Sequence, residues 1–483
     1  MTLLIKNIQL LDGTGQAAVK TDILVKKEKI YAIGSFPNYK ADEIIDGMGA
    51  YLAPGFIDIN TDSDHYLTLF SNPSQKDFLL QGVTTIIGGQ CGASLAPLLY
   101  GSLESIKSWV DTGRTNINWQ TTAEFLKIMD KISLGVNFGT LVGHYTIRQS
   151  LIGNTFRKLT RNEIAVFKSL LERSLKEGAF GFSTGLGYSQ SQQVPYSEIK
   201  PLVETVFKFK GLYTTHLRNE REGLLDSVNE TIKITKETGV KTLISHFRPI
   251  SGFQEDYEIS LGLISKNISK ADIYFDLCPF STSEVPISIL LPSWAQNSNK
   301  ETMLKNLQTP GIREKILKEL PKMNGRKIII TSAPGNEYLT GESLEEFSAN
   351  RNLDVKNGLL TLMEITDFQA VVFYGNIDLK GVHKALVHER AIIASNSAKF
   401  TFPRFLELSE KEKILPIEKA VNKISGFPAQ RLGLQDRGVV KDGNFADLVI
   451  FRDSKIRDVI LNGKIVVRDG EFNNVLEGKI LRS

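Results

Sequence analysis

The sequence contains very little cysteine, with only Cys91 and Cys278 among 483 residues. Two cysteines exclude the disulfide framework that stabilises small secreted proteins. The first residues lack the basic, apolar and small-residue pattern of a secretory signal. No apolar run approaches the ~20 residues that are needed to cross a bilayer. We therefore expect a protein of the reducing cytoplasm that has no membrane partner.

The sequence also lacks an excess of charge of either sign. Lys and Arg number 58 and Asp and Glu number 54, which gives a net charge of +4 without a long run of one sign. Proteins that bind nucleic acids or membrane surfaces usually carry a clustered basic excess. The charge balance therefore argues against a nucleic-acid partner as well as a membrane partner.

Both ends of the chain consist of short apolar runs separated by turn residues. Near the C-terminus, Asn462-Gly463 stands between two apolar runs, which is a strong signal for a β-hairpin. Pieces that are rich in strands and turns normally form a small sandwich or barrel. We predict that residues 1–54 and 430–483 meet in one small β domain.

Between these ends, short apolar strands alternate with helical segments, which is the pattern of a parallel sheet covered by helices. The eight strand candidates are residues 56–59, 83–87, 136–142, 179–183, 212–215, 241–245, 272–277 and 391–395. Eight such strands predict an α/β fold of the (β/α)8 TIM-barrel type over residues 55–429. The seventh and eighth candidates are too far apart for one crossover, so we predict an inserted subdomain or lid at residues 285–350.

A cluster of oxygen-bearing side chains follows the first predicted strand. Asn60, Asp62 and Asp64 occupy alternate positions, so they can lie on one face as the chain leaves the strand. On this stretch alone, a polar or metal site and a solvated loop are equally good interpretations. The other strand ends are needed to decide between them.

Ligands for a soft metal collect at the ends of other predicted strands. The carboxyl ends carry the chemistry in a barrel of this kind, and Cys91, His144, His216 and His246 fall there. Each one alone has an ordinary interpretation, as a buried thiol or a hydrogen-bonded histidine. Together, Cys91, His216 and His246 form a zinc-type donor set that leaves a position open for water. His144 is better interpreted as a supporting or structural group.

A series of short motifs runs along nearly the whole chain. The motifs include Ala53-Pro-Gly-Phe-Ile-Asp58, Gln81-Gly-Val-Thr-Thr85, Gly143-His-Tyr-Thr-Ile-Arg148, Thr215-His-Leu-Arg-Asn-Glu220 and Gly443-Asn-Phe-Ala-Asp-Leu448. In this order they resemble the amidohydrolase superfamily, and most closely the N-acyl-D-amino-acid deacylases, or D-aminoacylases. The resemblance implies a barrel, a β domain built from both termini and a small insertion, in agreement with the strand pattern.

The resemblance also implies an activity and a cofactor. Members of this family hydrolyse the amide bond of a small-molecule substrate, so we expect an N-acyl amino acid or a dipeptide-like compound. Their tightly held zinc ion sits on a Cys and two His, which correspond to Cys91, His216 and His246. Metal-activated water attacks the carbonyl, while an Asp after the eighth strand transfers protons.

Two positions depart from the family pattern. Asn60-Thr-Asp62 stands where the family has His-x-His, and Asn396 stands where it has the catalytic Asp. An Asn cannot accept a proton at neutral pH, so we expect Asp62 to take over proton transfer or to act as an oxygen ligand. The alternative is a family member with impaired catalysis that keeps the fold and the metal and acts as a binding protein.

Three residues are candidates for substrate contact. Arg248 replaces a lysine of the family and keeps its charge with a different geometry. His144 and Asn60 are the other two candidates, because each follows a predicted strand on the same rim. The sequence leaves the substrate side chain, its chirality and assembly into a homo-oligomer open.

Overall fold

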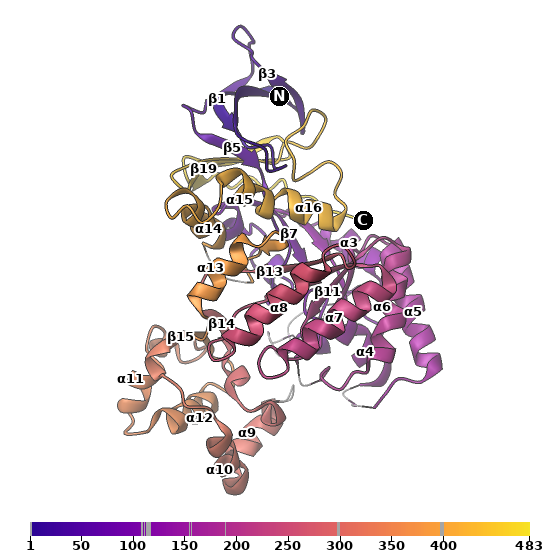
Figure 1. The fold of residues 1–483 in the computed structure, drawn as a ribbon, viewed down its shortest axis with the longest axis vertical. Coiled ribbons are helices and arrows are strands. Elements are labelled where there is room, and N and C mark those ends of the chain that lie inside the picture. Colours follow the sequence, from indigo (N-terminus) through magenta and orange to yellow (C-terminus); the bar gives the residue numbers. More distant parts are fainter. Residues whose placement is uncertain are drawn as a thin grey trace.

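The computed structural model of the chain has three parts along its long axis (Figure 1). A β domain carries the N-terminus, helices surround a barrel in the middle, and a mostly helical subdomain lies at the far end. The structure describes residues 2–107, 110, 112, 117–153, 155, 157–188, 190–296, 300–396 and 400–483. The predicted fold class, a barrel with a β domain from both termini and an insertion, is confirmed.

Strands from both termini form one nine-stranded sheet in the order β21-β20-β19-β18-β5-β1-β2-β3, with β4 beside β1. The strands are β1 Thr2–Leu10, β2 Val19–Lys26, β3 Lys29–Gly34, β4 Glu43–Asp46, β5 Tyr51–Pro54, β18 Leu448–Arg452, β19 Lys455–Leu461, β20 Lys464–Arg468 and β21 Glu471–Phe472. The antiparallel pair of β5 and β18 joins the two ends of the chain. Asn462 and Gly463 have φ of +48° and +78°, as a tight hairpin turn requires, so the hairpin is confirmed.

Eight strand positions form the barrel. They are β6 Phe56–Asp58, β7 Val83–Gly88, β8 Asn137–Thr140 continued by β9 Val142–Gly143, β10 Gly181–Gly185, β11 Leu212–His216, β12 Lys241–Ile244, β13 Ile273–Leu277 and β17 Ala391–Ile393. The third position is interrupted at Leu141, whose N–H donates to the carbonyl of Gly88 in β7. The N–H of Asn396 donates to the carbonyl of Asn60 at 3.2 Å, which brings the end of the last strand against the end of the first.

Helices cover the outside of the barrel (Figure 1). They are α1 Thr68–Ser71, α2 Lys76–Leu79, α3 Thr122–Met129, α4 His144–Ile152, α5 Arg161–Lys176, α6 Tyr196–Lys208, α7 Leu224–Thr238, α8 Gln254–Asn267, α13 Leu379–Val387, α14 Thr401–Glu410, α15 Ile417–Ile424 and α16 Gly426–Leu432, with a 3₁₀ turn at Glu104–Ile106. Capping boxes at Thr121 and Thr160 begin α3 and α5. Within the described ranges, no helix is both long and apolar enough to cross a membrane.

The insertion between β13 and β17 has its own sheet and core. Its sheet has the order β14-β16-β15, with β14 Ser283–Pro286, β15 Ile328–Ser332 and β16 Val371–Tyr374. Its helices are α9 Lys300–Gln308, α10 Pro310–Glu319, α11 Leu344–Ala349 and α12 Val355–Ile365, with 3₁₀ turns at Ile287–Leu290, Ser293–Ala295, Gly325–Lys327 and Glu337–Leu339. The buried cluster of this region runs from Ile287 to Val372, so the subdomain packs around a separate apolar core.

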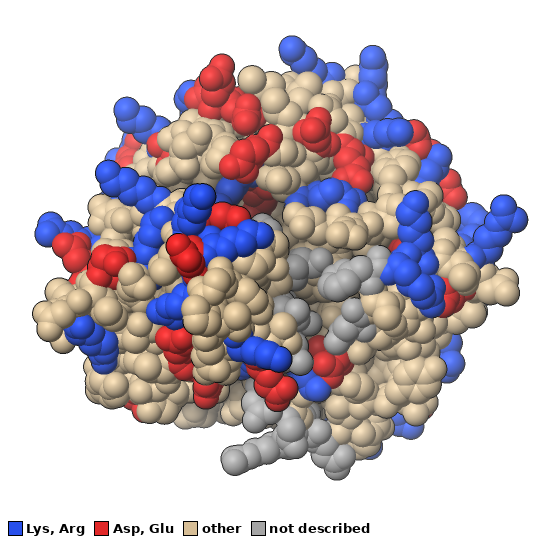
Figure 2. Space-filling view, turned by 90° about the horizontal axis from the view of Figure 1, so that it is seen from below, with Lys and Arg blue, Asp and Glu red and all other residues tan. Residues whose placement is uncertain are grey.

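The surface carries charges of both signs. On the face seen in Figure 2, Lys and Arg are interspersed with Asp and Glu. A near-neutral balance of 58 basic and 54 acidic residues predicts such a mixed surface.

Candidate metal centre

Three side chains from three strand ends converge at the carboxyl end of the barrel. Cys91 follows β7, His216 ends β11, and His246 follows β12. All three are buried, and their ligand atoms lie within 4.8 Å of one another. Cys91 Sγ is 3.3 Å from His246 Nε2, and the two imidazole rings meet edge to face with centroids 4.3 Å apart. The structure therefore brings the three predicted metal ligands together.

The backbone is in the left-handed region at several of these strand ends. The φ angle is +52° at Cys91, +37° at His246 and +42° at Asn396. Such a conformation of a non-glycine residue costs on the order of 1–3 kcal/mol and is concentrated at functional sites. At His246 the conformation is held by Asp276, whose carboxylate accepts the His246 N–H at 2.8 Å. The position of these side chains is thus maintained against local backbone strain.

The donor set fits a zinc ion. A thiol and two imidazoles are preferred zinc ligands, and the buried His216 Nδ1 has no hydrogen-bond partner among the described residues. Burial and the charge of His246 lower the pKa of His216 to about 3, so its ring is neutral at pH 7, as a ligand must be. Burial also lowers the pKa of His246, but the charges of Cys91 and Glu220 outweigh this effect and raise it to about 10.

Glu220 lies beside both imidazoles. One of its oxygens is 3.3 Å from His246 Nδ1, and the other is 3.8 Å from His216 Nε2. Burial alone would raise the pKa of Glu220, but the two histidines hold it well below its usual range. The sequence analysis assigned no role to this residue. The signal that could have identified it is a carboxylate four positions after a predicted metal ligand in the same motif.

A cavity of about 360 Å³ opens beside the histidines. Its wall includes His216, Glu220, Arg248, Val285, Tyr374 and Asn376. Arg248 donates from Nη1 to Ser283 Oγ at 2.7 Å, whereas its buried Nε has no hydrogen-bond partner within the described part of the chain. The predicted substrate-binding arginine thus lies in the cavity wall with one buried donor that has no partner in the described chain.

Asn60 belongs to a buried polar cluster below the rim. Its Nδ2 donates to the Asp276 carboxylate at 3.2 and 3.3 Å, and its Oδ1 has no partner among the residues that the structure describes. Burial raises the pKa of Asp58 to about 7 and that of Asp276 to about 6. The sequence analysis did not identify these two carboxyl groups, because their titration near neutral pH depends on burial.

Asp62 is paired with a buried histidine. Its Oδ1 lies 3.0 Å from His65 Nδ1, and its side chain is 18% exposed. Burial lowers the pKa of His65, but the charges of Asp64 and Asp62 outweigh it and raise the value to about 10, so His65 presents a positive charge to Asp62. Asp62 also lines a cavity of about 190 Å³ together with Ser395.

Tyr188 lies close to both Asp62 and the metal centre. Its ring centroid is 4.8 Å from that of His216. Burial raises the pKa of Tyr188 well above its usual value, and the charges of Cys91 and Asp62 raise it further. Tyr188 was not identified from the sequence, although it directly follows the glycine-containing segment at the end of β10.

His144 makes its contacts away from the metal centre, with residues of α5 and α6. Its Nε2 is 2.9 Å from Glu198, which also accepts a hydrogen bond from Arg148 Nε at 3.0 Å. Its ring stacks on Phe167 of α5 with centroids 5.4 Å apart. The structure does not bring His144 into the metal cluster, and its contact with a substrate stays a prediction.

Known proteins resemble this chain over its full length, although no protein-family model matches it. D-aminoacylase from Alcaligenes xylosoxydans xylosoxydans is 29% identical and covers 99% of this chain and 97% of its own length. A solved D-aminoacylase that defines a novel subset of amidohydrolases has a TM-score of 0.83 at 26% identity, with 100% and 99% of the chains covered.

A third protein is similar to this chain in fold. The N-acyl-D-glutamate deacylase from Bordetella bronchiseptica, solved with zinc and a phosphonate inhibitor, has a TM-score of 0.82 at 24% identity. It covers 100% of this chain, and this chain covers 99% of it. In sequence and in structure the chain is thus similar, from end to end, to D-aminoacylases of the amidohydrolase superfamily.

Proposed function

We propose that the chain is a metal-dependent hydrolase of a linear amide, with an N-acyl amino acid or a dipeptide-like compound as its substrate. The observation that carries this proposal is the buried cluster of Cys91, His216 and His246, whose ligand atoms lie within 4.8 Å of one another. One zinc ion bound tightly by these residues would polarise the substrate carbonyl and lower the pKa of a water molecule.

Asp62 is the residue that we assign to proton transfer. Its carboxylate lines a cavity at the rim, and His65 holds one of its oxygens at 3.0 Å. Asn396 stands at the position of the family's Asp, and its amide is not basic at neutral pH. The charge of Asp62 also acts on Tyr188, whose ring contacts that of His216 in a tilted arrangement. These contacts support a carboxylate that acts close to the metal centre from the opposite side of the rim.

Arg248 is the residue that we assign to the substrate carboxylate. A guanidinium binds a carboxylate through two parallel N–H donors, which a lysine cannot do. Its Nη1 is already held by Ser283, while Nε has no partner among the described residues. This arrangement supports a substrate that carries a carboxylate on the side of the 360 Å³ cavity. Asn60, whose buried Oδ1 likewise has no partner in the described chain, is a further candidate for substrate contact.

The test is turnover by zinc-loaded protein on a panel of N-acyl amino acids of both chiralities and of dipeptides. We expect Asp62→Asn to lower kcat by ~10²–10⁴-fold, as the loss of a general base does, with zinc content unchanged. Asp442→Asn, which alters an exposed carboxylate between α16 and β18, is the control. Equal kcat for Asp62→Asn and wild type would show that Asp62 does not transfer protons in the reaction.

A second function is favoured by Asn60 and Asn396, which stand where the family has a histidine and an aspartate. In that case the protein keeps the metal and binds amides without hydrolysing them. Calorimetry would then detect binding of panel compounds to a wild type that turns none of them over. Turnover by Asn396→Asp, set against an inactive wild type, would show that only the base had been lost.

A further inference from the structure

His65 is fully buried and has an acceptor opposite each of its ring nitrogens. Its Nδ1 lies 3.0 Å from Asp62 Oδ1, and its Nε2 lies 3.2 Å from the carbonyl oxygen of Ala93. A backbone carbonyl and an ionised carboxylate can accept a hydrogen bond but cannot donate one. Both ring nitrogens therefore donate, which makes the ring an imidazolium cation.

The titratable groups around His65 favour this cation. Burial by itself lowers the pKa of His65. Asp64 and Asp62 on the same segment, together with Cys91 from the segment after β7, act in the opposite direction and outweigh burial. Asp64 is itself buried, and its Oδ2 accepts the N–H of Gly89 at 2.6 Å. The negative groups around His65 thus stabilise its positive charge.

The segment after β6 holds the segment that carries the metal ligand Cys91. Asp64 accepts a hydrogen bond from Gly89, two residues before this cysteine. His65 donates to the carbonyl of Ala93, two residues after it. Between these two contacts Cys91 has a φ of +52°. The other nitrogen of His65 faces Asp62, so one ring links the assigned proton-transfer residue to the backbone beside a metal ligand.

We propose that His65 is a positioning residue, a buried imidazolium that fixes Asp62 relative to the segment of the metal ligand Cys91. The inference rests on the proton transfer that the proposed function assigns to Asp62. The Nδ1–H of His65 donates to one oxygen of the Asp62 carboxylate and keeps this group ionised and in one orientation. The Nε2–H anchors the same ring to Ala93. His65 acts on the reaction through Asp62.

Two substitutions separate the two contacts of the ring. An Asn carries its NH₂ group where a His carries Nδ1, and a Gln carries its NH₂ group close to the position of Nε2. His65→Asn therefore keeps a donor for Asp62 and loses the donor for Ala93, whereas His65→Gln does the opposite. Both variants lack the positive charge. His383→Gln, on α13 in the outer layer of helices, is the matched control.

The first measurement is kcat on the panel compound that the wild type turns over fastest, at matched zinc content. We expect His65→Gln to lower kcat by ~10²-fold, the usual cost of misplacing a reacting group by about 1 Å. His65→Asn should lower kcat less, and His383→Gln should match wild type. Equal kcat in His65→Gln and wild type would overturn the proposal. A smaller loss in His65→Gln than in His65→Asn would also overturn it, because the contact with Ala93 would then be the one that matters.

The second measurement asks whether His65 acts through Asp62. In Asp62→Asn the carboxylate is already absent, so the addition of His65→Gln should lower kcat no further. A merely structural histidine would cause the same loss in both backgrounds. A further loss in the double variant as large as the loss in the wild-type background would therefore overturn the proposal.

The third measurement needs neither a variant nor turnover. Ring-¹⁵N NMR of the zinc-loaded wild type at pH 7 should show protons on both nitrogens of His65, and a neutral ring would overturn the proposal. A doubly protonated His65 in a wild type that hydrolyses no panel compound would reject the proposed function and leave the link between Asp62 and Ala93 standing. An active wild type whose kcat does not respond to His65→Gln would do the reverse.

Discussion

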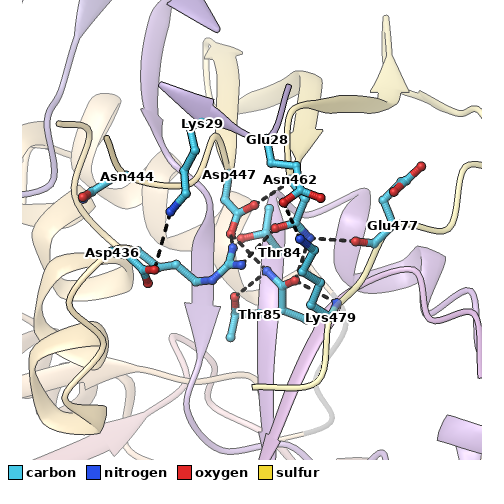
Figure 3. A network of polar contacts seen from close by, with 12 residues as sticks. Glu28, Lys29, Thr84, Thr85, Asp436, Asn444, Asp447, Asn462, Glu477 and Lys479 are labelled. Atoms are coloured by element: carbon cyan, nitrogen blue, oxygen red, sulfur yellow. Dashed lines mark hydrogen bonds and ion pairs between the residues drawn. The ribbon is translucent and has the colours of Figure 1, made fainter. Parts of the chain in front are cut away.

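Two buried polar clusters lie at opposite ends of the barrel strands, and they differ in how completely their polar atoms are paired. The junction network consists of Asn137, Arg437, Asp447 and Asn462. It lies at the amino end, where Asn137 begins β8, and Figure 3 labels its members Asp447 and Asn462. The metal rim lies at the carboxyl end, where Cys91, His216 and His246 meet. The first cluster joins two domains, and the second brings the candidate metal ligands together.

The junction network pairs its polar groups with one another. Asn137 donates to Asp447 at 3.0 Å and accepts from Asn462 at 2.9 Å. Arg437 forms a buried ion pair with Asp447 and donates to Asn462 Oδ1 at 2.9 Å. None of these four side chains has a buried N or O atom without a partner in the described structure. The network thus ties the β domain to the barrel.

The metal rim leaves several buried polar atoms without partners among the described residues: Asn60 Oδ1, His216 Nδ1, Arg248 Nε and Ser395 Oγ. A buried polar atom without a partner costs ~1–3 kcal/mol, so native proteins keep few of them. Their concentration at one end of the barrel indicates that the rim is arranged for a ligand, whereas the paired network at the other end stabilises the fold.

The largest effect should follow from removing a metal ligand. We expect Cys91→Ser to weaken zinc binding by more than the ~10–100-fold that an outer partner contributes and to abolish turnover. Zinc analysis after dialysis and kcat/KM on the substrate panel would measure this. The unfolding free energy of the metal-free protein should stay near the wild-type value. Retention of zinc by Cys91→Ser would contradict our assignment of the metal centre.

A substitution in the junction network should lower the stability of the fold. Asp447→Asn leaves the buried Arg437 without its charge partner, which should lower the unfolding free energy by ~3–5 kcal/mol in urea titrations. Asp436→Asn breaks an exposed pair with Lys29, at 3.7 Å, and should cost only ~0–1 kcal/mol. Zinc affinity of the folded protein should not change in either variant. A loss of zinc affinity in Asp447→Asn would show that the junction network also supports metal binding, so the two clusters would not have separate roles.

The third effect concerns the pH dependence of the unfolding free energy. Burial raises the pKa of Asp58 from 3.8 to about 7, so between these values the folded state holds a proton that the unfolded state has released. Stability should therefore fall as pH rises through this window, by at most ~1.4 kcal/mol per pH unit for one proton. Asp58→Asn removes this group and should flatten the slope. Parallel slopes for wild type and variant between pH 4 and 7 would show that Asp58 titrates normally.

The fold class could be predicted from the amino-acid pattern alone, and so could the meeting of three candidate ligands at one rim. Alternation of strands and helices predicted eight barrel strands, because period-2 and period-3.6 patterns are local properties. The carboxyl ends of parallel barrel strands meet at one rim, so Cys91, His216 and His246 could be placed together before their distances were known. The hairpin at Asn462-Gly463 followed from the conformational preference of two adjacent residues.

The contacts among the side chains at the rim became apparent only in the folded chain. The approach of Glu220 to two histidines depends on the distance between neighbouring strand ends. The pairing of Asp62 with His65 and the direction of the His144 ring toward Glu198 depend on packing. The raised pKa of Asp58 depends on burial. None of these quantities is local in sequence, because each arises where segments far apart in the chain exclude water and constrain one another's side chains.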